Sequence, residues 1–159
     1  MKVSNKEYAL CIIDLQSDFS SSISYKVITS VRKEINKAIN RGNDILTVLY
    51  RQAGNLIPEI EELVKSYDKN QYVWKSTDSG ANEVYNALFS PQNIKVCGVN
   101  TDACVLRTVT DLSKIYFRDR RYNDKHIRIL EHACWSVTGE AGHMKGINLM
   151  RKNENVKLY

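Results

Sequence analysis

The apolar residues of this chain alternate between two spacings, and this alternation constrains the fold more than any other feature of the sequence. Continuous apolar runs, such as Tyr8–Leu15 and Ile94–Val99, are typical of strands that are buried on both faces. Other segments, such as Tyr25–Gly42, carry apolar residues at helical spacing. Regular alternation of strand and helix predicts an α/β fold with a doubly wound, mainly parallel sheet and helices on both faces.

The same two patterns place the remaining elements along the chain. We expect further strands at 44–50, 71–76, 126–133 and 155–159, and helices at 58–67, 81–89, 103–117 and 139–152. The 159 residues include only seven glycines and two prolines, which leaves no recognisable linker. A single domain over residues 1–159 is therefore expected.

The N-terminal region and the cysteines indicate the cellular compartment. The first apolar run ends at Asp14, which makes it too short for a signal peptide or a membrane span. The four cysteines show no CxxC spacing, and Cys11, Cys97 and Cys134 lie in or beside apolar strand-like runs. We therefore expect inert, buried thiols at these three positions, a cytoplasmic location and no membrane partner.

Three reactive side chains fall at the ends of predicted strands. Asp14 closes the first strand, Lys75 closes the third, and Cys104 follows the fourth, in the first turn of the next helix. The carboxyl ends of parallel strands meet at one edge of the sheet, which is where ligands bind. Taken singly, each residue also has a structural explanation, as a helix cap, a solvated edge charge or a small buried group.

The three groups would be chemically complementary if they met. A helix N-terminus stabilises a thiolate through its dipole and free N–H groups, and a nearby ammonium lowers the thiol pKa further. An aspartate within reach can take the thiol proton and later return it to a leaving amine. The turn before Cys104 can also offer backbone N–H groups to an oxyanion. The pattern therefore predicts a nucleophilic cysteine site.

Three segments resemble the signature segments of the isochorismatase-like cysteine hydrolases, a superfamily that includes nicotinamidases, N-carbamoylsarcosine amidases and isochorismatases. These segments are CIIDLQSDF, VWKS and CGVNTDACVLRTVTDL, and they follow the family's order between Tyr8 and Leu112. The most specific part is the Gly-Val-x-Thr-Asp-x-Cys-Val element at Gly98–Val105. The resemblance implies a Rossmann-like fold and a small-molecule substrate.

The resemblance also implies roles for individual residues. Asp14, Lys75 and Cys104 would form the catalytic triad. A non-proline cis peptide bond would join Val99 to Asn100, and the backbone N–H groups of Asn100 and Cys104 would form the oxyanion hole. The resemblance further suggests that such chains associate, so we expect a homodimer or a larger homo-oligomer.

The chain departs from the family pattern around this predicted site. The segment Arg51–Asn70 is shorter than usual and contains no histidine, whereas nicotinamidases hold a divalent ion with Asp and His residues in this region. The three histidines, His126, His132 and His143, also lack metal-ligand spacing. We therefore predict that the protein holds no metal and needs no cofactor.

Several other side chains received specific predictions. Phe19 is expected to line the substrate pocket, while Asp18 caps or braces the following loop. Trp74 is expected to pack in the core, and His143 to lie on a helix surface. His132 ends the fifth strand, so it either reaches the substrate crevice or forms a structural hydrogen bond.

These patterns predict a cysteine hydrolase that cleaves a small amide or ureido C–N bond through a thioester intermediate. The alternative is a binding or assembly protein that keeps the fold without turnover, as the short segment Arg51–Asn70 suggests. Net charge is +5, and the segment Lys114–Arg128 mixes cations with aromatic residues. Because no RNA-binding or DNA-binding motif accompanies it, we favour a solvated helix end over a nucleic-acid interface.

Overall fold

The computed structural model describes residues 8–159, apart from the side chains of residues 21 and 22, and it centres on a six-stranded sheet. The strand order is β3-β2-β1-β4-β5-β6, and all neighbouring strands are parallel. The strands are β1 (Ala9–Ile13), β2 (Ile45–Tyr50), β3 (Asn70–Lys75), β4 (Ile94–Val99), β5 (Ile127–Trp135) and β6 (Val156–Leu158). The order reverses between β1 and β4, which confirms the predicted doubly wound α/β fold.

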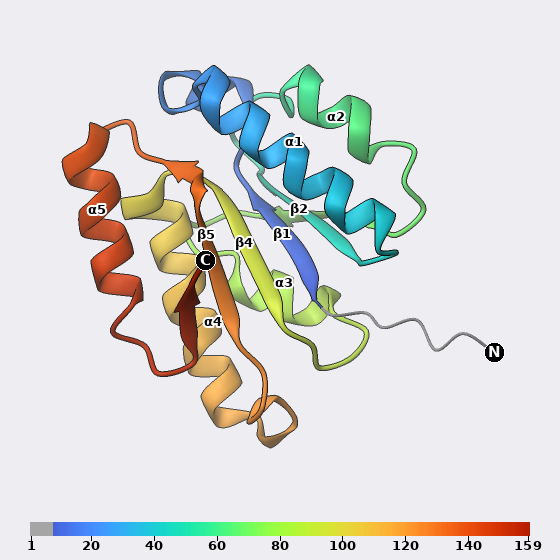
Figure 1. Ribbon diagram of the computed structural model, residues 1–159, viewed down its shortest axis with the longest axis vertical. Coiled ribbons are helices and arrows are strands. Elements are labelled where there is room, and N and C mark those ends of the chain that lie inside the picture. Colours follow the sequence, from blue (N-terminus) through green and yellow to red (C-terminus); the bar gives the residue numbers. More distant parts are fainter. Residues whose placement is uncertain (1–7) are drawn as a thin grey trace.

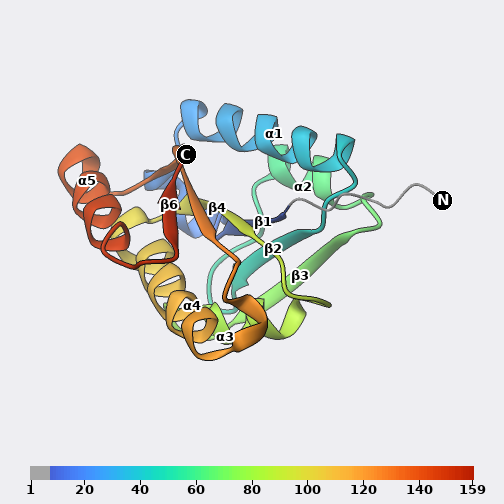
Figure 2. The ribbon, with the colours of Figure 1, turned by 60° about the horizontal axis from the view of Figure 1, so that its bottom comes forward.

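Helices cover both faces of this sheet (Figure 1). They are α1 (Tyr25–Asn40), α2 (Pro58–Val64), α3 (Ala81–Ala87), α4 (Leu106–Arg118) and α5 (Gly139–Met150). Figure 2 shows α1 and α2 on one face, with α3, α4 and α5 on the other. Two short 3₁₀ turns, Ser17–Ser22 and Arg120–Tyr122, were not predicted, because such short turns have no periodic apolar pattern.

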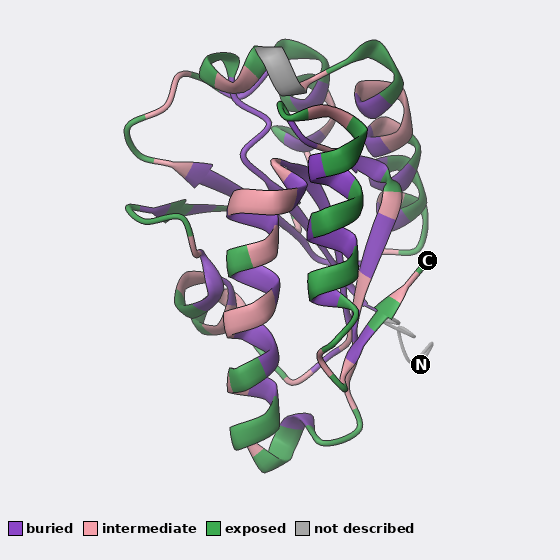
Figure 3. Ribbon diagram, turned by 90° about the vertical axis from the view of Figure 1, so that its left-hand side faces the viewer, coloured by how far each residue is buried: buried purple, intermediate pink, exposed green. Residues whose placement is uncertain are grey.

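The core lies along the central strands. All residues of β1 and β4 are buried, including Lys95, the one charged residue of β4. Figure 3 shows burial concentrated on these strands and on the inward sides of the helices. The helix α1 begins where the Ser24 hydroxyl accepts a hydrogen bond from Val27 N, at 3.3 Å, and its apolar stripe then packs on the sheet. None of the helices within residues 8–159 is both long and apolar enough to cross a membrane.

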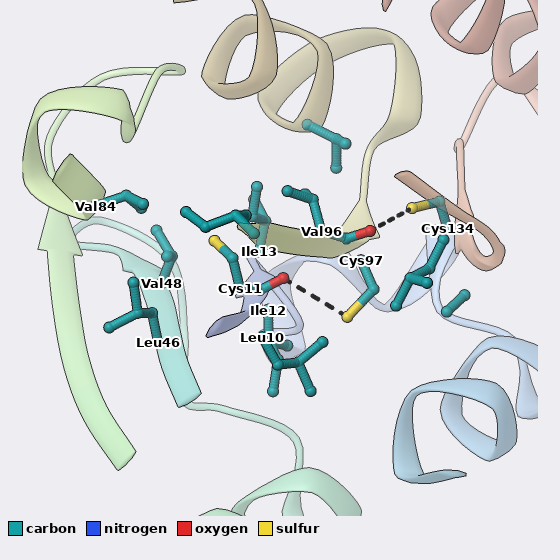
Figure 4. Close-up of a cluster of buried hydrophobic side chains, with 14 of the residues drawn as sticks. Leu10, Cys11, Ile12, Ile13, Leu46, Val48, Val84, Val96, Cys97 and Cys134 are labelled. Carbon is teal, nitrogen blue, oxygen red and sulfur yellow. Dashed lines mark hydrogen bonds between the residues drawn. The ribbon is translucent and has the colours of Figure 1, made fainter. Parts of the chain in front are cut away.

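Cys11, Cys97 and Cys134 are buried in this core, as predicted. Cys97 Sγ contacts the carbonyl oxygen of Cys11 at 3.7 Å, and Cys134 Sγ contacts that of Val96 at 4.0 Å (Figure 4). Burial raises the pKa of Cys11 and of Cys134 to about 12. These thiols are therefore protonated at neutral pH, and their near-complete burial shields them from reagents.

Trp74 contradicts its prediction. It lies on β3, an edge strand of the sheet, and 46% of its surface is exposed, as is 42% of Tyr72 two residues earlier. Side chains two residues apart in a strand share a face, and here the buried face is the one that holds Val73 and Lys75. The prediction that Trp74 packs in the core was therefore wrong.

Candidate active site

Asp14 stands immediately after β1, at the carboxyl edge of the sheet. Its backbone N–H still donates to Val48 O of β2 at 3.0 Å, but its φ angle is +53°, in the left-handed region. Aspartate adopts this conformation more readily than most residues other than glycine. The chain turns away from the sheet here, and the Asp14 carboxyl group is left 1% exposed.

Lys75 is the last residue of β3, and its side chain meets Asp14 across the intervening strand β2. The two form an ion pair of 2.9 Å, and Lys75 is 0% exposed. The ammonium also donates to the carbonyl oxygens of Thr77 and Asp78, at 3.1 and 3.3 Å, and lies 4.8 Å from the centre of the Tyr50 ring. These partners offset part of the cost of burying the ammonium.

Cys104 lies on the turn that follows β4. The position of this turn was predicted correctly, but its conformation was not. The peptide bond between Val99 and Asn100 is cis, which confirms that expectation. The predicted helical start is a π-helical turn over Thr101–Val105, in which Val105 N donates to Asn100 O at 3.1 Å. Such turns are rare and frequent at functional sites. Cys104 is 8% exposed on this turn.

A glycine lets β4 run close to β1 just before this turn. Gly98 has a φ of +126°, and a Cβ atom there would lie only 2.1 Å from the carbonyl oxygen of Ile13. No other residue fits this position without displacing the backbone. Because Ile13 precedes Asp14, this close approach also brings Asp14 near the turn that carries Cys104.

Side chains from the β5–α5 region brace the turn. Asp102 accepts hydrogen bonds from the hydroxyl groups of Ser136 and Thr138, at 2.5 and 2.8 Å. Burial raises the pKa of Asp102, but these hydrogen bonds outweigh burial and hold it below the usual value. Asn100 Oδ1 accepts from Val137 N at 2.9 Å, which ties the turn after β4 to the loop after β5.

His143 also supports the turn, which contradicts the prediction of a surface position. It is buried, its Nδ1 lies 2.8 Å from Thr101 Oγ1, and its ring stacks on Trp135 at 5.1 Å. The helix α5 approaches closely because a Cβ atom at Gly146 would lie 2.4 Å from Thr101 O. No periodic pattern reveals this packing, since α5 presents its glycines rather than a long apolar stripe to the turn.

The structure brings Asp14, Lys75 and Cys104 together, but their electrostatics differ from the sequence-based expectation. Burial raises the pKa of Cys104 to about 12, and the neighbouring Asp14 carboxylate raises it further than Lys75 lowers it. Burial likewise raises the pKa of Asp14, although Lys75 and Cys104 oppose this effect. The prediction of a thiol with a lowered pKa was therefore wrong, because it ignored desolvation and the acid.

The other predicted residues take varied places. Phe19 is half-buried and packs against the core beside the 3₁₀ turn, and Asp18 is exposed. Gln16 is fully buried, where its amide bonds Tyr50 and the carbonyl oxygen of Gly54 and so braces the loop after β2. The His132 ring is largely exposed, and its Nε2 lies 3.4 Å from Glu34 Oε1 of α1, which agrees with a structural contact.

Within residues 8–159, no three His, Cys, Asp or Glu side chains gather in a group that could hold a metal ion. The residues near Cys104 therefore do not form a site for a divalent ion of the kind that nicotinamidases hold. The absence of a bound metal stays a prediction, and no step below involves one.

The protein is therefore an α/β protein with a doubly wound parallel sheet. Its candidate nucleophile, Cys104, lies beside a buried ion pair of Asp14 and Lys75. Comparison with known families then identifies the lineage. The isochorismatase domain matches residues 8–157, so the chain belongs to the isochorismatase family.

Solved structures share this fold at low sequence identity. The MAR1 ribonuclease of Caenorhabditis elegans has a TM-score of 0.77 and 19% identity, over 99% of this chain and 79% of that one. A nicotinamidase of Staphylococcus aureus has a TM-score of 0.74 and 14% identity, over 97% and 99%. An isochorismatase-like hydrolase of Alkaliphilus metalliredigens has 0.71 and 18%, over 96% and 94%. A comparison with curated protein sequences finds no match. At these identities, the likeness establishes the fold alone.

Proposed function

We propose that this chain is a cysteine hydrolase that cleaves a C–N bond of a small amide or ureido compound. Asp14, Lys75 and Cys104 are its proposed catalytic residues. The observation that carries the proposal is the buried Asp14–Lys75 ion pair beside a thiol, at the sheet edge where ligands bind in α/β folds. Burying two opposite charges costs stability, so such a pair is expected to serve a chemical role.

In the resting state the nucleophile is a thiol rather than a thiolate. Its pKa of about 12 keeps Cys104 protonated at neutral pH, while the raised pKa of Asp14 makes that carboxylate a stronger base than usual. The raised pKa of Asp14 supports transfer of the thiol proton to this carboxylate, whereas the raised thiol pKa opposes it, so the transfer must accompany the attack of the sulfur on the substrate. Lys75 keeps the carboxylate ionised until that step, because protonation of Asp14 breaks the ion pair.

The bond changes follow from this starting state. Cys104 Sγ bonds the substrate carbonyl carbon as Asp14 takes the thiol proton, and the oxyanion is met by the N–H groups of Asn100 and Cys104. The C–N bond then breaks, and the leaving amine takes the proton from Asp14. Water, activated by the same carboxylate, hydrolyses the thioester to release the acid and restore the thiol. Phe19 is proposed to contact the substrate from the turn after β1.

A screen of small amides and ureido compounds, with ammonia release as the readout, tests this function. Wild-type protein should turn over at least one compound, Cys104→Ala should turn over none, and the matched variant Cys134→Ala should keep the activity. Turnover by Cys104→Ala at the wild-type rate would overturn the proposal. Mass spectrometry should also show that a turned-over substrate leaves an acyl group on Cys104 at early times.

The alternative is a binding or assembly protein without turnover. Two observations favour it: the raised thiol pKa, and the exposed Trp74 and Tyr72 beside the short segment Arg51–Asn70. Under this alternative, ligands would bind equally well to wild-type protein and to Cys104→Ala, with no product from either. Calorimetric titration of both proteins with the compounds of the screen therefore separates the two functions.

Contact with nucleic acid is a further candidate, since the structure is similar to that of the MAR1 ribonuclease. A groove of about 760 Å³ contains the basic residues Lys114, Arg118, Lys125 and Lys152. However, Lys114 and Lys125 are paired with neighbouring acids, Asp111 and Asp124, and the groove lies beside the start of β5, away from Cys104. We therefore keep the interpretation that Lys114–Arg128 is a solvated helix end. Tight, salt-dependent binding of single-stranded RNA would contradict it.

We also propose association of identical chains through α5. Val137, Met144 and Leu149 are each more than one third exposed on or beside this helix. Exposed apolar side chains that gather on one element are typical of contact surfaces. Light scattering should give at least twice the chain mass of 18.3 kDa, and Met144→Lys should reduce that mass.

A further inference from the structure

A row of basic residues crosses three neighbouring strands at the amino end of the sheet. Lys95 of β4 is in register with Arg128 of β5, and Arg128 is in register with Lys157 of β6. Residues at paired positions project from the same face of a sheet. Like charges at such positions destabilise strand pairing. The row therefore concentrates positive charge at this end of the sheet, with Lys157 exposed, Arg128 half-buried and Lys95 buried.

Lys95 is the most deeply buried member of this row. It is 6% exposed, and its ammonium lies 4.1 Å from the centre of the Tyr8 ring and 4.6 Å from that of Tyr159. Both distances are within the range of cation–π contacts. Within residues 8–159, no Asp or Glu forms an ion pair with this ammonium. A buried charge held only by aromatic rings is incompletely compensated.

The helix α1 covers this face and adds charge of the same sign. Burial lowers the pKa of Lys95, and the nearby cations Arg41, Arg128 and Lys37 lower it further, while Glu34 opposes them. Glu34 already forms a 2.7 Å ion pair with Lys37. The single carboxylate of Glu34 therefore acts on Lys95 from a distance while it also pairs with Lys37, and no carboxylate within residues 8–159 contacts the Lys95 ammonium directly.

These residues enclose a cavity, which we call the amino-end pocket. It has a volume of about 300 Å³ and is lined by Tyr8, Arg41, Asn93, Lys95, Arg128 and Tyr159. This volume is at the lower end of the range for small-molecule sites. The lining combines an ammonium, two guanidinium groups, an amide and two phenols, so nearly every polar group can donate a hydrogen bond.

We propose that the amino-end pocket binds a phosphate group, either as inorganic phosphate or as a small phosphate monoester. A phosphate dianion supplies the negative charge that the row lacks. Arg128 offers the planar, two-pronged donor geometry that suits phosphate oxygens, and Lys95 offers a point charge on the floor of the pocket. The small volume admits a phosphate with a compact organic group and excludes a polymer.

The pocket is distinct from the candidate active site. Lys95 lies four residues before Val99 in β4, which places the two roughly 13 Å apart along the strand. Cys104 follows Val99 at the opposite edge of the sheet. Phosphate binding therefore does not depend on the proposed hydrolase function, and each can fail without the other.

Isothermal titration with inorganic phosphate, at constant ionic strength held with chloride, tests this proposal on the full chain. Phenyl phosphate serves as the monoester in a second titration. Wild-type protein should bind at least one of the two with a 1:1 stoichiometry, and Lys95→Met should weaken that binding at least tenfold. Tighter binding of phenyl phosphate identifies the monoester as the preferred source of the group; tighter binding of inorganic phosphate identifies the free ion.

Two further variants keep the test decisive. Arg128→Gln changes a half-buried residue and should also weaken binding, even if Lys95→Met does not fold. Lys65→Met removes one positive charge from an exposed position after α2 and should bind as wild type does. Absence of saturable binding to wild-type protein at about 10 mM ligand would overturn the proposal, because a binding free energy weaker than about 3 kcal/mol is not that of a specific site. An equal loss of affinity in Lys65→Met and Lys95→Met would overturn it as well.

Discussion

Each end of the sheet buries one lysine, and the two lysines differ in the groups that contact their ammonium ions. At the carboxyl end, Lys75 is fully buried and paired with Asp14 at 2.9 Å. At the amino end, Lys95 is almost as buried, but it meets two tyrosine rings and further cations instead of a carboxylate. The carboxyl end holds its ammonium in direct contact with a carboxylate, and the amino end holds its ammonium against aromatic rings.

This difference teaches how burial of the same side chain can serve two purposes. A neutralised pair stays in place without a ligand, so it can hold a carboxylate in position for proton transfer. An uncompensated cation costs stability until an anion arrives, which makes it suited to recognition rather than to chemistry. Substitutions at each end should therefore differ in both size and sign of effect.

The largest effect is expected at the carboxyl end, where Cys104→Ala should abolish hydrolysis, with a loss of at least about 10⁴-fold. The substitution removes the only proposed nucleophile but little core volume. The substitution should therefore change the free energy of unfolding, measured with urea, by less than about 1 kcal/mol. Loss of activity together with a large loss of stability would instead mean that Cys104 has a structural role.

Breaking the Asp14–Lys75 pair should have the next largest effect. Lys75→Met leaves Asp14 buried without its partner, which should lower the free energy of unfolding by about 3–5 kcal/mol. The double variant Asp14→Asn with Lys75→Met removes both charges and should be more stable than Lys75→Met alone. Urea titrations of the three proteins measure this; equal stability of the single variant and wild type would show that the pair is not buried in solution.

The pH dependence of Cys104 alkylation should then show the protonated thiol. With a pKa of about 12, the thiolate fraction rises about tenfold for each pH unit between 7 and 10, and the rate with iodoacetamide should rise in proportion. Asp14→Asn removes a neighbouring negative charge, so it should lower the thiol pKa and speed alkylation at fixed pH. A rate that stays constant from pH 6 to 9 would restore the lowered pKa that the sequence alone suggested.

Most of the fold was predictable from sequence because buried strands and amphipathic helices leave periodic patterns. The strands Ala9–Ile13 and Ile94–Val99 and the helix Tyr25–Asn40 all lie where their apolar residues placed them. The carboxyl ends of β1 and β3 then located Asp14 and Lys75 by topology alone. Such inferences need only the order of elements, which local patterns determine.

The remaining features depend on contacts between distant segments. Trp74 is exposed because β3 is an edge strand. The order of strands across a sheet cannot be predicted from the local spacing of apolar residues. His143 is buried because Gly146 lets α5 approach the turn at Thr101. The cationic row at the amino end is likewise invisible in sequence, because its members become neighbours only through the strand register.

The smallest effect is expected at the amino end, and its sign distinguishes the two lysines. Without added phosphate, Lys95→Met should leave the free energy of unfolding unchanged or raise it by up to about 1 kcal/mol, because it removes a like-charge contact with Arg128 while keeping an unbranched side chain of similar length. Phosphate should stabilise wild-type protein but not this variant. A loss as large as that expected for Lys75→Met would reveal an anionic partner for Lys95.

The pH dependence of this difference follows from the lowered pKa of Lys95, which burial and the neighbouring cations depress below its unfolded value of about 10.4. Between the folded and the unfolded pKa, the unfolded chain binds more protons than the folded chain. Stability contributed by Lys95 must therefore rise as pH increases through that window, and stay constant below it. Urea titrations of wild type and Lys95→Met should thus show the stability advantage of the variant shrinking as pH rises toward 10. An advantage that grows instead would mean that the folded protein favours the charged form of Lys95, as it does for an ammonium with a carboxylate partner.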